Sequence, residues 1–458
     1  MHGLPPWHSV AAMLSKEQNE MITSTGADTP GGQLLRRYWQ PAALVEELPD
    51  ARPLIPVRLM GEDLLLFRNG GGSYGLTSRH CAHRGADLKY GRLEDGGLRC
   101  PFHGWLYDVN GACLQQPAEP ADSNFHTKVH LKSYPCREIN GVVFAYMGPG
   151  DAPTMPEFDC FVAPNSHTFA FKGFVDCNWL QLLEVGIDPS HASFLHRFFD
   201  DQVPDDNYGR QFQFETEEAG IPITKLLRDF DCPEIEYEET EYGLRIFALR
   251  RLNDAEMHVR VTNMFYPNAA VIPMSNDMML TQWHVPISDT QSWWYAIFTS
   301  FENEVDKEFM RRDRLALYSV PDYKPRKNKA NNYGFDANEQ MRRTYTGMGE
   351  DINVHDQWAV ESLGPIQDRV QEHLGTADKA IIANRRLLIK AIDDAAAGID
   401  PIMTVAKTNA AEFRGPVSID TVASVENWRQ EWRGHAAKRR AGSSWAPDAE
   451  RKARADVE

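Results

Sequence analysis

Two cysteines and two histidines within residues 79–105, RHCAHRGADLKYGRLEDGGLRCPFHGW, constrain this chain more than any other feature. Cys81 and His83 form a Cys-x-His pair, and Cys100 and His103 form a Cys-x-x-His pair after sixteen intervening residues. Four such side chains can bind one zinc ion in a tetrahedral site. They can equally hold a [2Fe–2S] cluster in which two cysteines bind one iron and two histidines bind the other.

The distribution of the four residues over two loops favours the cluster. A zinc finger usually keeps its cysteine pair apart from its histidine pair, whereas here each loop supplies one residue of each kind and can reach both irons. Gly85, Pro101 and Gly104 suit tight turns in which the backbone approaches sulfur closely. A zinc-binding structural module remains the alternative on these residues alone.

The rest of the chain predicts several further parts. A length of 458 residues is too great for one compact core. Two short helices joined by a Gly/Pro turn are expected over 16–40, and short strands punctuated by Gly, Asn and Asp indicate an antiparallel β domain over 41–150. A Pro/Gly linker over 148–158 separates it from a mixture of strands and helices. The clearest helices are expected at 365–374 and 377–398.

Composition restricts the partners and the compartment. The net charge of −17 argues against nucleic acid or an anionic membrane as the main partner. No signal peptide and no apolar run of membrane-spanning length is recognised. Seven cysteines in a chain of this length indicate a reducing compartment, so a cytoplasmic protein is expected. No strand–GxGxxG–helix pattern is present, so NAD(P)H is expected to bind a separate protein.

A second motif follows the linker, in CNWLQLLEVGIDPSHASFLHRFF at 177–199. Asp188, His191 and His196 form D-x2-H-x4-H. Asp188 followed by Pro189 is a good helix start, so Asp188 could simply be a helix cap. Two histidines five residues apart lie about 140° apart around an ideal helix. They share one site only if the turn between them is widened, as in a π-bulge, or if one of them stands at a helix end.

Either histidine alone could be a satisfied core imidazole, but both together, after the cysteine–histidine motif, predict two ligands of a 2-His-1-carboxylate site, which binds Fe(II) and leaves positions open for dioxygen. The third ligand would be a carboxylate from elsewhere in this acidic chain, and Asp356 in INVHDQWAVESLGPIQDR and Asp351 are candidates. Either carboxylate could instead lie on the surface without a ligand role.

The residues now resemble a known family. The motif C-x-H-x16-C-x-x-H followed by Gly-Trp resembles the Rieske motif. Over roughly residues 14–395 the chain resembles the oxygenase (α) component of Rieske non-heme iron oxygenases, in particular the phthalate dioxygenase-like branch. Three stretches carry this resemblance: QNEMITSTGADTPGGQLLRRYWQPAAL, CNWLQLLEVGIDPSHASFLH and ESLGPIQDRVQEHLGTADKAI. In that family a strand bearing D-x4-E precedes the closing helix, which Asp356 and Glu361 match.

The resemblance implies an α+β fold with an antiparallel β Rieske domain and a helix-grip catalytic domain. The expected parts are an N-terminal helical segment packed on the catalytic domain (1–40), the Rieske domain (41–150), the catalytic domain (151–430) and a mobile tail (431–458). It also implies a [2Fe–2S] cluster at Cys81, His83, Cys100 and His103, and an iron at His191, His196 and Asp356.

The resemblance further implies how electrons move. A separate reductase, directly or through a ferredoxin, would reduce the cluster with NAD(P)H, and the cluster would reduce an Fe(II) site that uses dioxygen. The chains would form a homotrimer, or stacked trimers, in which the cluster of one subunit faces the iron of the next. Asp188 would then bridge His103 of one subunit to His191 of its neighbour, since an ionised carboxylate can orient two imidazoles.

The substrate is expected to be a small aromatic compound. Arg245 and Arg250 are candidates for binding an anionic substrate, although exposed arginines on a strand would look the same; Arg251 points to the opposite face from Arg250. The Met-rich stretch at 264–280 suits a neutral aromatic or ordinary core. Monooxygenation, by hydroxylation or oxidative N- or O-dealkylation, is preferred; cis-dihydroxylation of an aromatic carboxylate such as a phthalate is the alternative. A stand-alone Rieske electron carrier would not need the remaining 300 or so residues.

Overall fold

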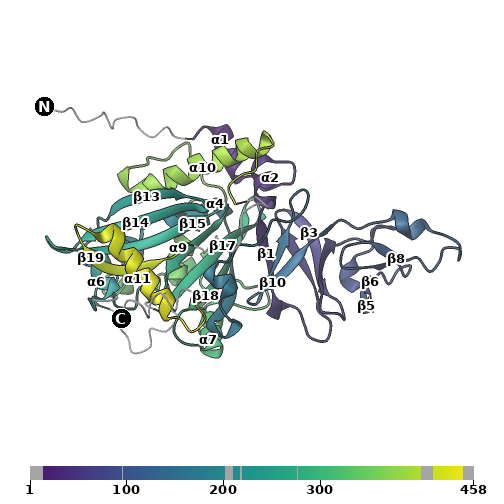
Figure 1. Cartoon of the computed structure of the whole chain (residues 1–458), viewed down its shortest axis with the longest axis horizontal. Helices are drawn as coiled ribbons and strands as arrows, with labels where there is room; N and C mark the ends of the chain where they lie inside the picture. The colour runs from purple at the N-terminus through teal and green to yellow at the C-terminus, as the bar shows by residue number, and fades with distance from the viewer. Residues whose placement is uncertain are drawn as a thin grey trace.

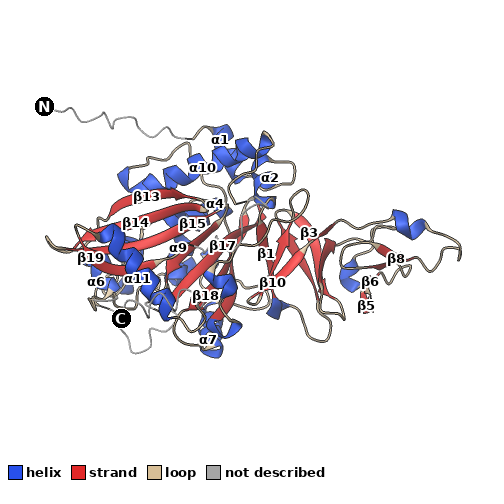
Figure 2. Cartoon of the chain, viewed as in Figure 1, coloured by secondary structure: helices blue, strands red, loops and turns tan. Residues whose placement is uncertain are grey.

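The computed structural model describes residues 14–94, 96–201, 210–216, 219–275, 277–403 and 416–446. Two β-rich bodies follow one another along the long axis of the molecule, a small one built from the first third of the chain and a large one built from the rest (Figure 1). Strands dominate both bodies, and helices gather around the large one (Figure 2). Among the helices described, none is long and apolar enough to cross a membrane.

The small domain consists of antiparallel sheets that meet at β3. One sheet has the order β2 (Leu54–Leu59), β3 (Glu62–Arg68), β4 (Tyr74–Ser78) and β9 (Ser133–Tyr134). A second has the order β5 (Arg92–Glu94), β6 (Gly97–Arg99), β7 (Leu106–Tyr107) and β8 (Cys113–Gln115). A three-stranded sheet of β1 (Trp39–Leu44), β11 (Val142–Tyr146) and β10 (Cys136–Ile139) lies towards the large domain (Figure 1).

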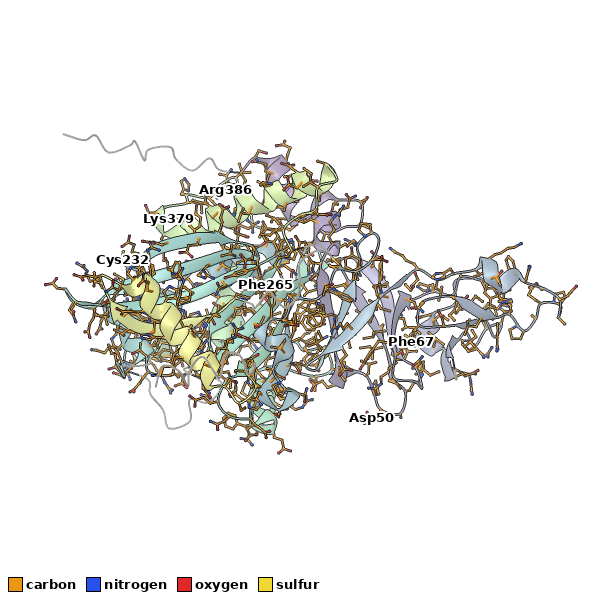
Figure 3. The ribbon with its side chains drawn as sticks, in the orientation of Figure 1. Asp50, Phe67, Cys232, Phe265, Lys379 and Arg386 are labelled. Atoms are coloured by element: carbon orange, nitrogen blue, oxygen red, sulfur yellow. The ribbon has the colours of Figure 1, made fainter. Side chains whose placement is uncertain are left out.

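The apolar run in β3 is explained by two cores on opposite faces of its sheet. Leu64 and Leu66 join the main core, whereas Leu65 and Phe67 join a separate core that also contains Cys81 and other residues of the cysteine–histidine loops. Alternate side chains of a strand point to opposite faces, so a strand buried on both sides is apolar throughout. In Figure 3, Phe67 marks the small-domain core and Phe265 the main core.

An eight-stranded antiparallel sheet forms the large domain. Its order is β12 (Thr168–Val175), β18 (Gln291–Ser300), β17 (Met278–Ser288), β16 (Ala269–Pro273), β15 (Glu256–Phe265), β14 (Gly243–Arg251) and β13 (Glu234–Thr240), and β19 (Ile419–Ser424) also pairs with β15. Helix α4 (Trp179–Ile187) packs on one face of this sheet, beside α9 (Ile352–Ser362). Helix α11 (Trp428–Gly442) packs on the other, because Phe247 of β14 contacts Trp428 and Trp432, whereas its neighbour Ile246 faces the main core.

The remaining helices cover the edges. The predicted N-terminal pair is confirmed as α1 (Lys16–Thr23) and α2 (Pro30–Arg36), and both pack against α10 (Lys379–Ala396), which confirms the helix expected at 377–398. The other α-helices are α3 (Asp159–Val162), α5 (Ala192–Leu195), α6 (Ile223–Asp229), α7 (Lys307–Leu317) and α8 (Ala337–Gln340). Short 3₁₀ turns occur at Val45–Glu47, Leu88–Tyr90, Phe125–Lys128, Asn165–His167, Lys329–Gly334 and Thr376–Asp378.

The helix predicted over 365–374 is wrong. This segment is irregular, and two of its polar residues pair with α4. The Gln367 backbone N–H donates to Gln181 at 2.8 Å, and the Arg369 guanidinium donates to Glu184 at 2.9 Å.

The mobile tail predicted over 431–458 is wrong for its first part. Residues 431–442 belong to α11, whose Trp428, Trp432 and Ala436 recur every four residues and are buried on the sheet. An apolar stripe with this spacing holds a helix on a core even where the rest of the helix is charged. Residues 447–458 lie outside the described part of the chain.

Candidate metal centres

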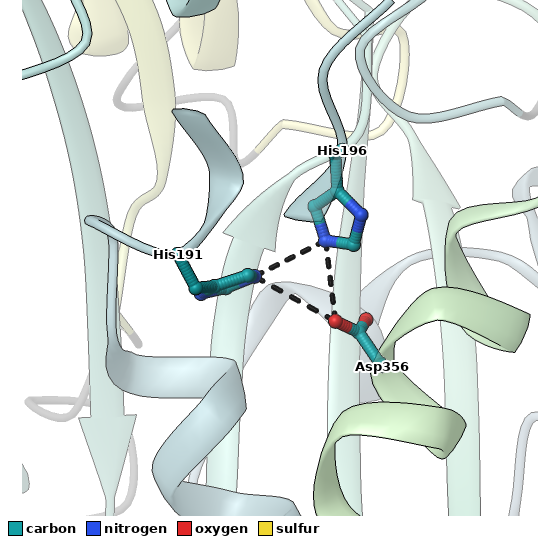
Figure 4. A group of neighbouring side chains, drawn as sticks. All are labelled: His191, His196 and Asp356. Atoms are coloured by element: carbon teal, nitrogen blue, oxygen red, sulfur yellow. Dashed lines mark hydrogen bonds and ion pairs between the residues drawn. The ribbon is translucent and has the colours of Figure 1, made fainter. Parts of the chain in front are cut away.

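The two histidines of the second motif converge with Asp356 (Figure 4). His191 Nε2 and His196 Nε2 lie 3.1 Å apart. Asp356 Oδ1 lies 3.6 Å from His191 Nε2 and 3.2 Å from His196 Nε2. The structure thus brings together three predicted residues from segments far apart in the sequence, in a geometry that could hold one metal ion.

The turn between the histidines is a short helix of ordinary geometry, so the predicted widened turn is wrong. Helix α5 contains only Ala192–Leu195; His191 immediately precedes it and His196 immediately follows it. His196 has left the helical conformation, with φ −107° and ψ 21°. The alternative of a histidine at a helix end is therefore confirmed, and it applies to both residues.

Asp356 reaches the site from helix α9, not from a strand as the family pattern suggested. Glu361, the second acid of the D-x4-E pattern, accepts hydrogen bonds from Tyr333 and Gln357 and so has a separate structural role. The alternative ligand Asp351 caps the start of α9 by accepting the Asn353 backbone N–H at 2.9 Å, and it also faces Arg314 at 3.5 Å.

The protonation of the triad suits a cation. Burial lowers the pKa of His191, and burial, together with Arg260, lowers the pKa of His196 to about 3, so both rings are neutral. The single proton of His191 lies on Nδ1, because that nitrogen faces the Asp188 carbonyl, and its Nε2 is left bare. Asp356 Oδ1 is buried and accepts no hydrogen bond from the described residues. Bare imidazole nitrogen beside an unpaired carboxylate oxygen fits a divalent metal such as Fe(II).

Asp188 is not the cap of α5 that its sequence context suggested. It ends α4, and its side chain accepts the Ser190 backbone N–H at 2.8 Å in a local turn. Its other carboxylate oxygen lies 3.9 Å from His191 Nδ1, and burial raises the pKa of this carboxyl. Asp188 therefore supports His191, and about a fifth of its side chain stays exposed.

The first motif forms a second centre at the far end of the small domain. Cys81 and Cys100 are buried in its core, while the rings of His83 and His103 lie 4.5 Å apart nearer the surface. Trp105 stacks on His83 at 4.5 Å with 10° between the planes, which holds that ring in one orientation. Both loops turn through a glycine with positive φ, Gly85 at +75° and Gly104 at +74°, where other residues would be strained.

The polar groups around these four residues fit a [2Fe–2S] cluster. His103 Nδ1 is buried and has no hydrogen-bond partner in the described part of the chain, as expected of a nitrogen that binds a metal. The Tyr107 hydroxyl lies 3.2 Å from Cys81 Sγ, within hydrogen-bonding distance. Such hydrogen bonds stabilise thiolate and tune the potential of a cluster.

A pocket opens above the His191–His196–Asp356 triad. It contains about 830 Å³ of empty space, part of which is open solvent. Its walls combine apolar and polar side chains. The apolar ones include Phe174, Val175, Leu182, Val185, Ile272, Leu280 and Trp294. Besides the triad, the polar ones include Asp188, Gln211, Arg260, Thr262, Gln282, His284, Asn353 and Gln357.

The two arginines proposed from the sequence do not line this pocket. Arg245 bonds Glu238 at 3.0 Å and stacks over Trp432 of α11, on the opposite face of the sheet. Arg250 is buried and donates to the Phe230 carbonyl at 3.0 Å and to Ser193. The expectation that Arg250 and Arg251 point to opposite faces is confirmed, since Arg251 is exposed.

Arg260 is the basic residue of the pocket, and sequence reasoning missed it. It lies at the middle of β15, pairs with the buried Asp420 and stands 4.8 Å over the Phe212 ring. A single arginine in the middle of a strand-like run, between two valines, was the available signal. Its carboxylate partner comes from β19, which the sequence did not place beside β15.

Comparison with known families agrees with these centres. Residues 38–135 match the model of the Rieske [2Fe-2S] domain, and residues 145–453 match the model described as LigXa C-terminal domain like. The first match supports the cluster and gives no support to the zinc alternative.

Several curated relatives align over most of the chain. The oxygenase subunit of phthalate 4,5-dioxygenase from Pseudomonas putida is 34% identical over 446 residues, covering 93% of this chain and 95% of the relative. The 5,5'-dehydrodivanillate O-demethylase oxygenase subunit of Sphingobium sp. is 32% identical and covers 85% and 83%. The oxygenase subunit of tert-butanol monooxygenase / tert-amyl alcohol desaturase from Aquincola tertiaricarbonis is 34% identical and covers 82% and 76%.

Solved structures share the fold at lower identity. A mutant of NdmA from Pseudomonas putida CBB5 with theobromine has a TM-score of 0.56 at 19% identity, covering 83% of this chain and 97% of that one. An oxygenase–ferredoxin complex of carbazole 1,9a-dioxygenase has a TM-score of 0.52 at 19% identity, covering 88% and 100%. With both domain models and these relatives matched, the chain belongs to the Rieske non-heme iron oxygenases, as the oxygenase component that carries a [2Fe–2S] cluster and a mononuclear iron and is served by a separate reductase.

Proposed function

We propose that this oxygenase monooxygenates a small aromatic compound, by hydroxylation or by oxidative N- or O-dealkylation. The observation that carries the proposal is the His191–His196–Asp356 triad beside a pocket in which a group of large apolar side chains forms part of the wall. An apolar wall binds an uncharged ring by burial, and the polar groups orient it. The O-demethylase and monooxygenase among the relatives are consistent with this reaction class.

The residues have distinct tasks in this proposal. His191, His196 and Asp356 would hold the iron, and Cys81, Cys100, His83 and His103 the cluster. When bound, the cluster supplies stored electrons and the iron supplies the place where dioxygen is activated for attack on carbon. The pocket walls hold the target carbon near the triad and exclude bulk water, which would otherwise compete for the oxidant.

We also propose that electrons pass between subunits of a homotrimer or stacked trimers. The cluster loops and the triad lie in different bodies along the long axis of one chain (Figure 1), which disfavours transfer within the chain. Phe102 and Phe125 are exposed beside the cluster loops, and Phe194 and Tyr345 are exposed beside the triad. A second copy that joined these two surfaces would cover both and bring His103 near the partly exposed Asp188.

The electron donor in this proposal is an NAD(P)H-dependent reductase, acting directly or through a ferredoxin. The ferredoxin complexes among the similar folds support the second route. The compartment proposed is the cytoplasm, which suits the free cysteines and a reduced nicotinamide donor.

Dihydroxylation of an aromatic carboxylate is the second candidate. Arg260 lines the pocket and pairs with the buried Asp420, and Arg250 lies buried on the adjacent strand, where the same carboxylate opposes the lowering of its pKa by burial. Two buried guanidinium groups sharing one carboxylate leave a positive potential that would favour an anion. The phthalate 4,5-dioxygenase subunit among the relatives agrees with this candidate.

A turnover assay with ¹⁸O₂ separates the two. The purified enzyme, with a reducing partner, would be given aromatic acids, aryl ethers and N-alkyl anilides, and the products analysed by mass spectrometry. One labelled atom in the product, with an aldehyde released from ethers or anilides, is the expected result. Two labelled atoms in a cis-diol of an aromatic acid would reject monooxygenation and establish the second candidate.

A further inference from the structure

We infer that His355 is a positioning residue that fixes which nitrogen of His196 faces the metal. This inference rests on the proposed iron site and adds a residue outside the ligand set. His355 precedes Asp356 in α9 and is fully buried. Its two ring nitrogens face Gly349 and His196, and neither faces the centre of the triad.

The Gly349 carbonyl determines the tautomer of His355. His355 Nε2 lies 2.8 Å from the Gly349 oxygen. A carbonyl oxygen can only accept, so Nε2 must carry the proton. In the neutral ring the other nitrogen, Nδ1, is then left with a lone pair and can only accept.

His355 in turn determines the tautomer of His196. The two Nδ1 atoms lie 3.3 Å apart, and the rings are nearly parallel, with 22° between their planes. Because His355 Nδ1 accepts, the single proton of neutral His196 must lie on Nδ1. His196 Nε2 is therefore bare, and it is the nitrogen that lies 3.2 Å from Asp356 Oδ1. The hydrogen-bond relay from the Gly349 carbonyl through His355 to His196 thus leaves the Nε2 lone pair of His196 free to bind a metal, even when no metal is bound.

The first acceptor of this relay is itself held in place. Gly349 has φ +91°, a conformation that favours glycine, and its N–H donates to Glu339 Oε1 at 2.8 Å. The same carboxylate oxygen accepts from Thr344 Oγ1 at 2.7 Å. Gly349, whose carbonyl accepts the His355 hydrogen bond, is thus held by its backbone conformation and by the hydrogen bond of its own N–H.

His284 provides a contrast in the same pocket. It is equally buried, yet neither of its ring nitrogens has a hydrogen-bond partner within the described residues. A histidine buried in this wall therefore need not form hydrogen bonds with its ring nitrogens. His355 uses both of its ring nitrogens, with Nε2 as donor and Nδ1 as acceptor, which is the arrangement that leaves His196 Nε2 without a proton.

The test is the affinity of the full-length, cluster-loaded protein for Co(II), a spectroscopic substitute for Fe(II). His355→Leu removes the acceptor, whereas His355→Asn keeps an oxygen near the position of Nδ1. Loss of a residue that orients a metal ligand weakens metal binding by about 10- to 100-fold. We expect that loss for His355→Leu, recovery of most of the affinity in His355→Asn, and wild-type affinity in the matched control His284→Leu.

Each other outcome is decisive. Equal affinity in His355→Leu and wild type overturns the inference and leaves the iron site intact. Equal losses in the Leu and Asn variants show a packing role only, which also overturns it. If wild-type protein binds no Co(II) at the triad, the iron site itself is wrong.

A measurement on wild-type protein covers the case in which His355→Leu does not fold. Proton NMR of the Co(II) form should show two hyperfine-shifted, exchangeable imidazole N–H signals, one each from Nδ1 of His191 and His196. A single such signal would overturn the inference.

Discussion

Histidine takes its role in this chain from what each ring nitrogen faces. His103 Nδ1 is buried and has no partner among the residues that the structure describes, His191 and His196 turn bare nitrogens to Asp356, and both ring nitrogens of His355 face hydrogen-bond partners. Burial lowers the pKa of His355 to about 4 and of His284 to about 3, so these rings stay neutral near pH 7. Neutral imidazole is the form that binds metal.

Asp188→Asn tests the proposed bridge. The amide oxygen can still accept the Ser190 N–H, but the negative charge facing His191 is lost. We expect unchanged iron content and an unchanged cluster spectrum, with steady-state turnover reduced by about 100-fold. The control is Asp322→Asn, which removes an exposed carboxylate that bonds Ser319. Wild-type turnover in Asp188→Asn would reject the bridge.

His284→Leu tests the cost of burying a neutral histidine. The folded pKa is about 3 and the ordinary value is 6.5, so below pH 6.5 the unfolded chain binds a proton that the folded chain does not. The free energy of unfolding therefore decreases as the pH falls below 6.5, because of His284, by at most about 1.4 kcal/mol per pH unit. Denaturant unfolding at pH 6.5 and pH 4.5 should show a smaller acid loss in the variant. An equal decrease in the free energy of unfolding of both proteins would show that the pKa of His284 is not lowered in the folded state.

At the scale of elements, buried ion pairs connect helices that the sequence places far apart. Glu184 of α4 accepts from Arg369 in the irregular segment and from Arg385 of α10, and Arg385 also pairs with Glu372. Both arginines hold the pKa of Glu184 below its usual value despite burial. Because α4 ends at Asp188, this network fixes the helix that leads into the iron site.

Glu184→Gln should destabilise the large domain strongly. Removing one charge from a buried network leaves uncompensated guanidinium groups and costs about 3 kcal/mol or more. The matched control is Glu239→Gln, whose partner Arg386 also lies on α10 but whose pair is largely exposed, so a loss below about 1 kcal/mol is expected. Chemical denaturation of both variants measures the difference. Equal small losses would mean that the buried network is dispensable.

At the scale of the whole molecule, the separation of the two centres predicts complementation between chains. Cys81→Ser should abolish the cluster and His191→Ala the iron site, so each variant alone is inactive. Co-expressed with different affinity tags and purified as mixed oligomers, they should regain a fraction of wild-type turnover, because an intact cluster then faces an intact iron across one interface. Mixed oligomers without activity would show that electrons stay within one chain.

Local spacing carried most of what the sequence revealed. The cysteine–histidine loops and the D-x2-H-x4-H motif predicted six candidate ligands because each pair lies within one short segment, where chain geometry limits how far the side chains can separate. Short apolar strand-like runs predicted the small β domain, and local helix and turn signals predicted the N-terminal helices, for the same reason. The widened turn failed because a helix can simply stop between two ligands, which residue spacing cannot distinguish.

Long-range packing decided the rest. A family pattern was enough to prefer Asp356, but not to place it on a helix. Two further contacts depend on how distant segments meet: the pairing of Arg260 with Asp420, and the contact of His355 with His196. The sequence alone determined the ligand types, the two centres and the family. Only the tertiary structure decided which basic residue enters the pocket and which histidine orients the site, because side chains from separate elements become neighbours only when the sheet and its helices pack.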